Sequence, residues 1–201
     1  MVSIIKLSLI PNIKNKFLDG NVLDTSRLFL RLVSIQDCKQ SYVDWLNDPR
    51  VNGYLETRWE NQTLSSVKTF VEQQRLSNNT FLFGIFLKAD DKHIGNIKLG
   101  PIIYPHNCAS ISFFIGDVSE WGKGYTTEAI NSIKDFAFKS GISRLEAGLY
   151  CENLGSFNAL RKNGFVVEGV QKNRLYIDGK WQDCILLGVQ CSERSSLKSS
   201  P

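Results

Sequence analysis

The stretch Ser119-Glu120-Trp121-Gly122-Lys123-Gly124-Tyr125-Thr126-Thr127-Glu128-Ala129-Ile130 decides the fold. Residues 111–116 before it, Ile-Ser-Phe-Phe-Ile-Gly, are apolar and rich in strand-forming residues, which predicts a buried strand. The residues after it predict a helix, because apolar side chains recur at the spacing of one helix face: Ala129, Ile130, Ile133, Phe136 and Ala137. A glycine-bearing loop between a strand and a helix directs backbone N–H groups and the positive end of the helix dipole at one point. The stretch therefore predicts an anion site, most often one for phosphate.

Length and composition describe a globular protein with no extreme feature. A chain of 201 residues with 42% hydrophobic and 22% charged residues suits one domain. The net charge is only +4 and no run of Lys and Arg appears, which argues against a nucleic-acid partner. Five cysteines without a paired spacing favour reduced thiols and a cytoplasmic location. With two histidines the chain offers few zinc ligands, so we predict no metal.

The two ends differ in character from the middle of the chain. Residues 1–26 contain a short apolar run that is interrupted by Lys6, which predicts an N-terminal strand or arm rather than a membrane span. Residues 191–201 are rich in Ser and Lys, and we expect a disordered tail there. The segment between them, residues 27–190, is expected to form one domain, and no membrane partner is predicted.

The middle of the chain predicts an α+β fold. Strands are expected over 28–33, 81–87, 93–99, 109–115, 144–150 and 165–170, with a final hairpin at Asp178-Gly179. Helices are expected after the capping residues Ser34, Thr63 and Asn153, and around 129–137. Pro49 is expected to stop the first helix, and residues 51–59 and 101–107 are expected to be loops. This order predicts a mixed, mostly antiparallel sheet with helices packed on it.

Two blocks of sequence carry a specific resemblance. Residues 121–129 resemble the acetyl-CoA pyrophosphate loop of the GNAT N-acetyltransferase superfamily, whose pattern is Gln/Arg-x-x-Gly-x-Gly/Ala. Trp121 takes the first place, Gly124 matches, and Thr126 replaces the last small residue. These departures are familiar in the branch similar to ribosomal-protein N-terminal (Rim-type) acetyltransferases. Residues 153–165 resemble the Asn-x-x-Ser … Lys-x-Gly-Phe block of the same branch, and the likeness runs from about Arg27 to Val189.

The resemblance implies a GNAT-like three-layer fold and a binding site for acetyl-CoA as co-substrate. Its central sheet has a V-shaped splay between the two middle strands, which holds the pantetheine arm, and helices lie on both faces. Glycines in the loop let phosphate oxygens approach the backbone, while Lys and Thr side chains add charge and donors. The alternative for the loop alone is an ordinary strand-to-helix turn. The donor-binding residues implied by the resemblance are Phe114, Ile115, Gly116, Trp121, Gly122, Lys123, Gly124, Tyr125, Thr126, Thr127, Asn153, Ser156, Asn158 and Arg161.

The catalytic residues that the resemblance implies are Ser156, Glu56 and Asn153. Ser156 takes the place where this branch puts a hydroxyl near the sulfur of the donor, and such a group could protonate the departing thiolate. The alternative is a first-turn helix residue that bonds only backbone. Many relatives use a Tyr at the position of Leu160, so a Tyr acid is excluded there. Glu56 is a candidate base, with an ordered water chain as the alternative, and Asn153 is first a helix cap.

On the acceptor side the candidates are Tyr54, Arg58 and Trp59. Arg58 could bind an acidic group of the acceptor, or form a surface ion pair with Glu56 worth only ~0–1 kcal/mol. The predicted function is acetyl-CoA-dependent N-acetyl transfer directly onto a primary amine. The acceptor is a protein N-terminus or a small amine such as a nucleotide-linked amino sugar. The alternative is a non-catalytic acyl-CoA-binding or sensing module on the same fold. The protein is expected to be a monomer or homodimer.

Overall fold

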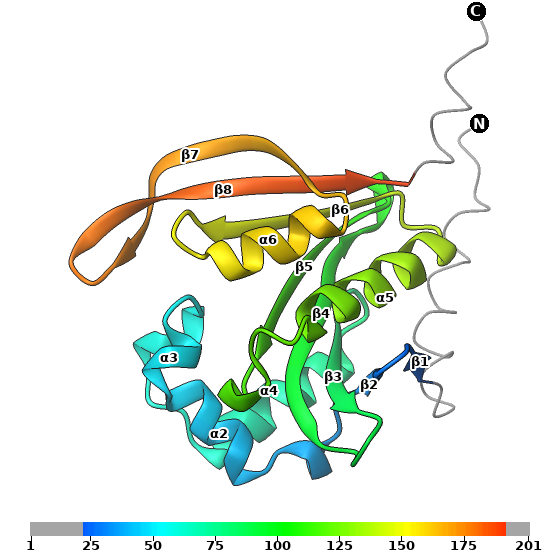
Figure 1. Cartoon of the computed structure of the whole chain (residues 1–201), viewed down its shortest axis with the longest axis vertical. Helices are drawn as coiled ribbons and strands as arrows, with labels where there is room; N and C mark the ends of the chain where they lie inside the picture. The colour runs from blue at the N-terminus through cyan, green and yellow to red at the C-terminus, as the bar shows by residue number, and fades with distance from the viewer. Residues whose placement is uncertain (1–21, 192–201) are drawn as a thin grey trace, which may run out of the picture.

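The computed structural model describes residues 22–191, which form a single eight-stranded sheet with helices on both faces (Figure 1). The strand order is β1-β2-β3-β4-β5-β6-β8-β7, and every neighbouring pair is antiparallel except β5 and β6. The predicted mixed, mostly antiparallel sheet is confirmed. The strands are β1 (Leu23–Asp24), β2 (Leu28–Leu32), β3 (Phe81–Leu87), β4 (His93–Ile103), β5 (Cys108–Ile115), β6 (Arg144–Tyr150), β7 (Val166–Ile177) and β8 (Lys180–Gln190).

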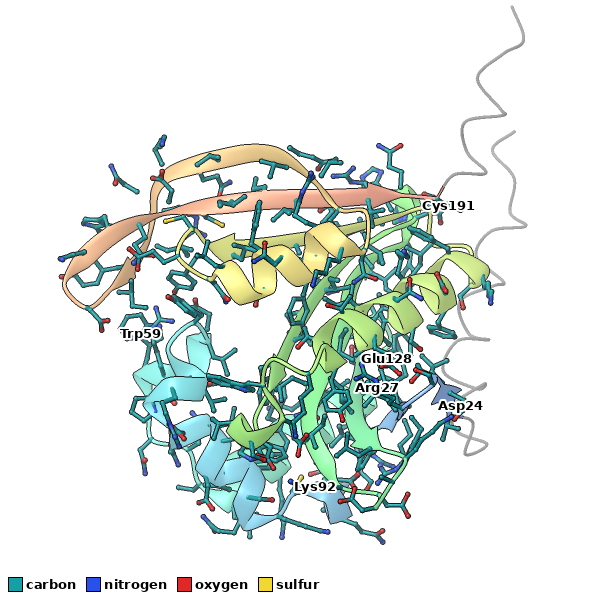
Figure 2. All side chains as sticks on the ribbon, viewed as in Figure 1. Asp24, Arg27, Trp59, Lys92, Glu128 and Cys191 are labelled. Atoms are coloured by element: carbon teal, nitrogen blue, oxygen red, sulfur yellow. The ribbon has the colours of Figure 1, made fainter. Side chains whose placement is uncertain are left out.

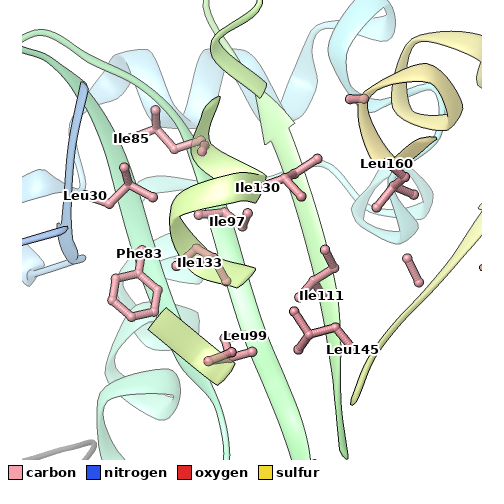
Figure 3. Packing of buried hydrophobic residues seen from close by; sticks show 14 of the residues in the cluster. Leu30, Phe83, Ile85, Ile97, Leu99, Ile111, Ile130, Ile133, Leu145 and Leu160 are labelled. Atoms are coloured by element: carbon pink, nitrogen blue, oxygen red, sulfur yellow. The ribbon is translucent and has the colours of Figure 1, made fainter. Parts of the chain in front are cut away.

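Helices cover the two faces of the sheet through two separate apolar clusters. On one face α5 (Tyr125–Lys139) and α6 (Leu154–Lys162) pack on the main core, where Ile130, Ile133 and Leu160 are buried against strand residues (Figure 3). On the other face α2 (Gln40–Asn47) and α4 (Leu64–Leu76) enclose a smaller cluster around Tyr42 and Val71. This arrangement gives the three layers that the sequence predicted. The remaining helical turns are α3 (Pro49–Asn52), η2 (Ile35–Asp37), η3 (Glu56–Trp59), η4 (Tyr104–His106) and η5 (Val118–Glu120).

The two parallel strands in the middle of the sheet pair for only part of their length. Cα partners link Cys108–Ser110 of β5 to Arg144–Glu146 of β6, and the pairing stops there. Beyond this point β5 continues to Ile115 beside β4, while β6 continues to Tyr150 beside β8. The strands therefore diverge toward their carboxyl ends, and the predicted V-shaped splay is confirmed. An edge opened in this way exposes backbone groups that a partner has to satisfy.

The buried carboxylate of Asp37 stabilises the η2–α2 region. Asp37, only 8% exposed, accepts hydrogen bonds from both terminal nitrogens of Arg31, at 2.7 and 2.6 Å, and from the backbone and hydroxyl of Ser34, both at 2.7 Å. Burial raises the pKa of Asp37, but these bonds outweigh it and lower that pKa to about 2. The carboxylate is thus ionised at neutral pH and ties β2 to the start of the α2 face.

One expectation about element boundaries was confirmed but incomplete, and two were wrong. Pro49 stops α2 as predicted, but it also opens α3. Its lack of an N–H is no loss at the first helical position, and the Asp48 side chain caps the turn by accepting from the Arg50 N–H. Residues 101–107 do not form only a loop, because β4 runs on to Ile103 past a register shift. Residues 56–59 form the short helix η3 rather than an irregular connection.

The ends of the described chain belong to the sheet. β1 lies within the segment predicted as a strand or arm, and it pairs with β2. Cys191 donates its N–H to the carbonyl of Ser143 at 3.0 Å. The other residues of the predicted arm and tail, 1–21 and 192–201, lie outside the described residues. Over residues 22–191, no helix has the length and apolar character needed to cross a membrane.

Candidate active site

A cavity of about 570 Å³ lies where the splayed strand, the glycine loop and the start of α6 meet. Its size falls in the range of small-molecule sites. Four segments far apart in the sequence contribute to its wall: the α3 region, the end of β5, the loop with the first turn of α5, and the first turns of α6. The lining residues are Arg50, Val51, Tyr54, Leu55, Phe113, Phe114, Ile115, Glu120, Trp121, Gly122, Gly124, Tyr125, Thr126, Thr127, Glu152, Asn153, Leu154, Gly155, Ser156, Asn158, Ala159 and Lys162.

The glycine loop has a backbone that requires glycine. Gly122 and Gly124 have φ values of +75° and +83°, a conformation that L-residues rarely adopt. A Cβ added to Gly122 would meet no atom of residues 22–191 within 4 Å, so its surface stays open to an approaching group. Gly124 is the N-cap of α5, and within the described part of the chain no side chain caps this helix. The first N–H groups of a 15-residue helix therefore border the cavity, which makes this point suited to an anion.

Lys123, predicted to face the anion, is occupied elsewhere. Its ammonium donates to a carboxylate oxygen of Glu120 at 2.8 Å, and Lys123 is not among the residues that line the cavity. Lys92 lies on the other side, 3.5 Å from Glu120 and 2.6 Å from Asp117. The hydrogen bond from Lys123 comes first among the causes that lower the pKa of Glu120. Since Glu120 is buried and lines the cavity, both cations balance its charge.

Trp121 supplies one partner for the opened edge of β5. Its indole Nε1–H donates to the carbonyl of Ile115 at 2.8 Å, while 46% of the residue remains exposed. Gly116, also predicted to bind the donor, faces away from the cavity. A Cβ there would lie 2.2 Å from the ring of Trp45, so this position is glycine because the aromatic ring packs against it.

At the start of α6 the cap and the candidate acid are separate groups. The Asn153 side chain accepts the backbone N–H of Ser156 at 3.1 Å, as the sequence predicted for a helix cap. The hydroxyl of half-buried Ser156 makes no hydrogen bond with any residue of the described range 22–191. It lines the cavity, so it is available to a ligand. Arg161 lies outside the lining, because its guanidinium donates to the carbonyl of Phe165 at 3.0 Å.

The acceptor-side candidates form a network around Tyr150, a residue that the sequence did not single out. The Tyr150 hydroxyl donates to Glu56 at 2.9 Å and accepts from Arg58. Burial raises the pKa of Tyr150 despite the opposing effect of Arg58, so the phenol stays protonated at neutral pH. Glu56 also accepts from the Trp59 indole at 3.3 Å, and its side chain is 73% exposed. The Tyr54 ring, which borders the cavity, packs 5.6 Å from that of Tyr150.

In this network Arg58 is largely buried and donates to other groups of the protein. Its side chain is only 10% exposed, and it donates to the carbonyls of Leu55 and Tyr176 at 3.0 and 3.1 Å. The guanidinium also lies 4.2 Å from the Trp59 ring centre. The bonds to Tyr150 and Tyr176 join η3 to β6 and β7, whereas the contacts with Leu55 and Trp59 lie within the η3 region. Both terminal nitrogens of Arg58, which was expected to bind an acidic group of the acceptor, donate to these protein groups instead.

Most of the predicted site residues gather at the cavity. Those that line it are Tyr54, Phe114, Ile115, Trp121, Gly122, Gly124, Tyr125, Thr126, Thr127, Asn153, Ser156 and Asn158, whereas Glu56, Arg58, Trp59, Gly116, Lys123 and Arg161 do not. The sequence reasoning missed Arg50, Glu120 and Glu152 in the wall. Glu120 adjoins Trp121 and was within reach of a motif-based argument. Arg50 and Glu152 carry no local signal, because only the folded chain brings α3 beside the start of α6.

Comparison with known proteins identifies the fold and the loop together. Residues 27–166 match the family described as the acetyltransferase (GNAT) domain. This range covers β2 to β6 and α6, includes the glycine loop and ends at the first residue of β7. The chain belongs to the GNAT acetyltransferase family. It is therefore an acetyltransferase enzyme, and its similarity to the Rim-type branch is confirmed by its relatives.

Among curated relatives, this acetyltransferase is 38% identical over 120 residues to the probable N-acetyltransferase YjcK of Bacillus subtilis. That match covers 58% of this chain and 66% of YjcK, slightly less than two thirds of its length. Two solved structures extend the likeness. The ribosomal-protein-S5-alanine acetyltransferase of Vibrio fischeri has a TM-score of 0.70 at 26% identity, covering 86% and 98% of the two chains. The spermidine N-acetyltransferase of Vibrio cholerae, solved with CoA and spermine, has a TM-score of 0.73 at 22% identity, covering 83% and 96%.

Proposed function

We propose that this acetyltransferase moves the acetyl group of acetyl-CoA directly onto a primary amine. The observation that carries the proposal is the single cavity wall shared by the uncapped start of α5, the splayed end of β5 and the free hydroxyl of Ser156. These are an anion site, an unpaired strand edge and a proton donor, in one continuous space. The three parts match the pyrophosphate, the pantetheine amides and the thioester sulfur of acetyl-CoA.

The donor is held by backbone groups more than by charged side chains. The pyrophosphate is assigned to the N–H groups of Gly122 to Thr127, with the hydroxyls of Thr126 and Thr127 as further donors. The pantetheine arm is assigned to the opened edge of β5 at Phe114 and Ile115. The side chains of Lys123 and Arg161 are left out of this assignment, because each donates to a protein acceptor instead.

In the proposed reaction the neutral amine nitrogen attacks the thioester carbonyl carbon. A nitrogen–carbon bond forms, the carbon–sulfur bond breaks, and the amine gives up one proton as the amide forms. Ser156, which lines the cavity, is the proposed proton donor to the departing thiolate, and it recovers its proton from solvent. Glu56 is the proposed base, acting through water, since it lies outside the cavity wall and is exposed on the acceptor side. Asn153 acts on the reaction only by holding the first turn of α6.

The acceptor side favours a cationic amine over an anionic one. Glu56 and Glu152 are exposed there, Tyr54 and Trp59 present exposed rings, and Arg58 has its donors turned inward. Carboxylates and aromatic faces both attract ammonium groups, and carboxylates repel phosphate. A protein N-terminus or a polyamine fits this surface better than a nucleotide-linked amino sugar. The two structural relatives named above are a ribosomal-protein-S5-alanine acetyltransferase and a spermidine N-acetyltransferase.

A panel of amines, with CoA release followed by a thiol reagent, tests the proposal. We expect turnover with one or more primary amines among N-terminal peptides, polyamines and amino sugars. For every active amine, the matched dimethylated amine should give none, because it has no N–H to lose. Incubation with labelled acetyl-CoA alone should leave no label on the protein, since transfer is direct.

Two outcomes contradict the proposal in different ways. Tight binding of acetyl-CoA without turnover across the panel would indicate the alternative, an acyl-CoA-binding or sensing module. Labelled protein after removal of the donor would indicate a covalent intermediate in place of direct transfer.

A further inference from the structure

Outside the cavity, both carboxylate oxygens of Glu128 accept hydrogen bonds from the segment before β2. Oε1 of Glu128 accepts from the hydroxyls of Thr25 and Ser26, at 2.7 and 2.9 Å, and from the backbone N–H of Arg27 at 2.8 Å. Oε2 accepts from Nε of Arg27 at 2.8 Å and lies 2.7 Å from Nη2 of the same guanidinium. Figure 2 labels Arg27, which lies just before β2, and Glu128, which lies in the first turn of α5.

The environment keeps Glu128 ionised. Burial raises its pKa, but the hydrogen bonds from Thr25, Arg27 and Ser26 outweigh it and lower the pKa to about 2. The side chain is 15% exposed, and it sits in the first turn of α5. A negative charge there stabilises the helix start, but unbalanced it would repel an anion bound at the same helix end. Arg27 balances that charge.

Arg27 also contacts three successive residues of the glycine loop. Nη1 donates to the carbonyl of Lys123 at 2.9 Å, and the guanidinium lies 4.6 Å from the ring centre of Tyr125. Between them, a Cβ built on Gly124 would lie 3.6 Å from Nη2. The guanidinium, which belongs to the segment before β2, thus joins the loop to the carboxylate of Glu128.

We propose that Arg27 and Glu128 are positioning residues for the donor, which hold residues 121–127 in the conformation that binds its pyrophosphate. The inference rests on the proposed function, because it assumes that acetyl-CoA binds at this loop. Neither side chain lines the cavity, so neither contacts the donor. A loop with two glycines at positive φ has much freedom to lose on binding. Contacts that fix it beforehand lower that entropic cost and improve affinity.

The test compares Arg27→Lys and Glu128→Gln with the wild type for acetyl-CoA turnover and for CoA affinity by titration calorimetry. Lysine keeps the charge but cannot reach Glu128 and the Lys123 carbonyl with one planar group. Each variant is expected to raise Kd and KM for the donor about 10-fold, equivalent to about 1.4 kcal/mol, with kcat within about two-fold. The double variant should bind the donor no more weakly than the weaker-binding single variant, because both changes break the same contact between Arg27 and Glu128.

Lys88→Ala is the matched control. Lys88 bonds Asp24 and the Thr25 carbonyl, so it anchors the same segment without touching the loop, and its removal should change Kd less than about two-fold. Variants with the wild-type Kd, or an equal loss in Lys88→Ala, would overturn the positioning role. Circular dichroism checks folding; if Glu128→Gln fails to fold, Arg27→Lys decides. A wild type that binds neither CoA nor acetyl-CoA would contradict the proposed function itself, which separates the two failures.

Discussion

Replacing Ser156 with alanine is expected to lower kcat about 100-fold while the Kd for acetyl-CoA changes little. The hydroxyl borders the cavity and makes no hydrogen bond with residues 22–191. Its proposed role is to donate a proton to the departing sulfur. The helix cap uses the Ser156 backbone N–H and the Asn153 side chain, both of which alanine leaves in place. The substitution therefore removes one proton donor without disturbing α6, and pre-steady-state measurement of CoA release reports its effect.

The control is Ser65→Ala, at an exposed serine in the first turn of α4 far from the cavity. That variant should keep the wild-type kcat. Unchanged turnover in Ser156→Ala would show that the Ser156 hydroxyl has no catalytic role. Water would then have to supply the proton. A large rise in Kd with unchanged kcat would make it a donor-binding residue instead.

Arg58→Ala is expected to destabilise the protein by about 2–3 kcal/mol, because it leaves without a donor the hydrogen-bond acceptors that the guanidinium now satisfies. Those acceptors are the Leu55 and Tyr176 carbonyls and the Tyr150 hydroxyl, on three separate parts of the chain. At this chain length the loss corresponds to a fall in Tm of about 5–10 °C, measurable by calorimetry. Because η3 would lose its link to β6 and β7, the KM for the acceptor amine should also rise, while the Kd for acetyl-CoA should not.

Arg75→Ala serves as the control, since Arg75 is exposed on α4 and no ion pair or hydrogen bond within residues 22–191 involves its side chain. Its Tm is expected to shift by no more than about 2 °C. An Arg58→Ala protein as stable as Arg75→Ala would show that the network around Tyr150 contributes little. A stable variant with a raised acceptor KM would favour direct binding of the acceptor by Arg58.

Sequence periodicity predicted the elements that bury one face, because burial leaves a repeating pattern. The strand at Arg144–Tyr150 and the helix after Gly124 were found in this way, whereas the cap at Asn153 was predicted from its residue type. It could not predict that β5 and β6 part after Ser110, since both halves of β5 have the same apolar character. The splay came from the resemblance, and pairing is a property of the assembled sheet.

Most of the predicted site residues that line the cavity lie inside the two motif blocks, and Tyr54, Phe114 and Ile115 are the others. The predicted residues outside the lining include charged side chains whose partners the sequence does not mark. Nothing local shows that Arg161 would donate to Phe165, or that Arg58 would meet Tyr150 across 92 residues. The Arg27–Glu128 pair joins positions 101 residues apart and was missed for the same reason. The sequence shows the charge of a residue but does not show which group that residue contacts in the folded chain.

Binding of acetyl-CoA, compared with acetyl-pantetheine, tests the central claim most directly. The second compound keeps the thioester and the amides but lacks the pyrophosphate that the glycine loop is proposed to hold. At about 100 times its Kd, acetyl-CoA should stabilise the protein by about 2.7 kcal/mol in thermal unfolding, and acetyl-pantetheine at the same concentration should give little shift. No shift with acetyl-CoA, or equal shifts with the two compounds, would contradict the account.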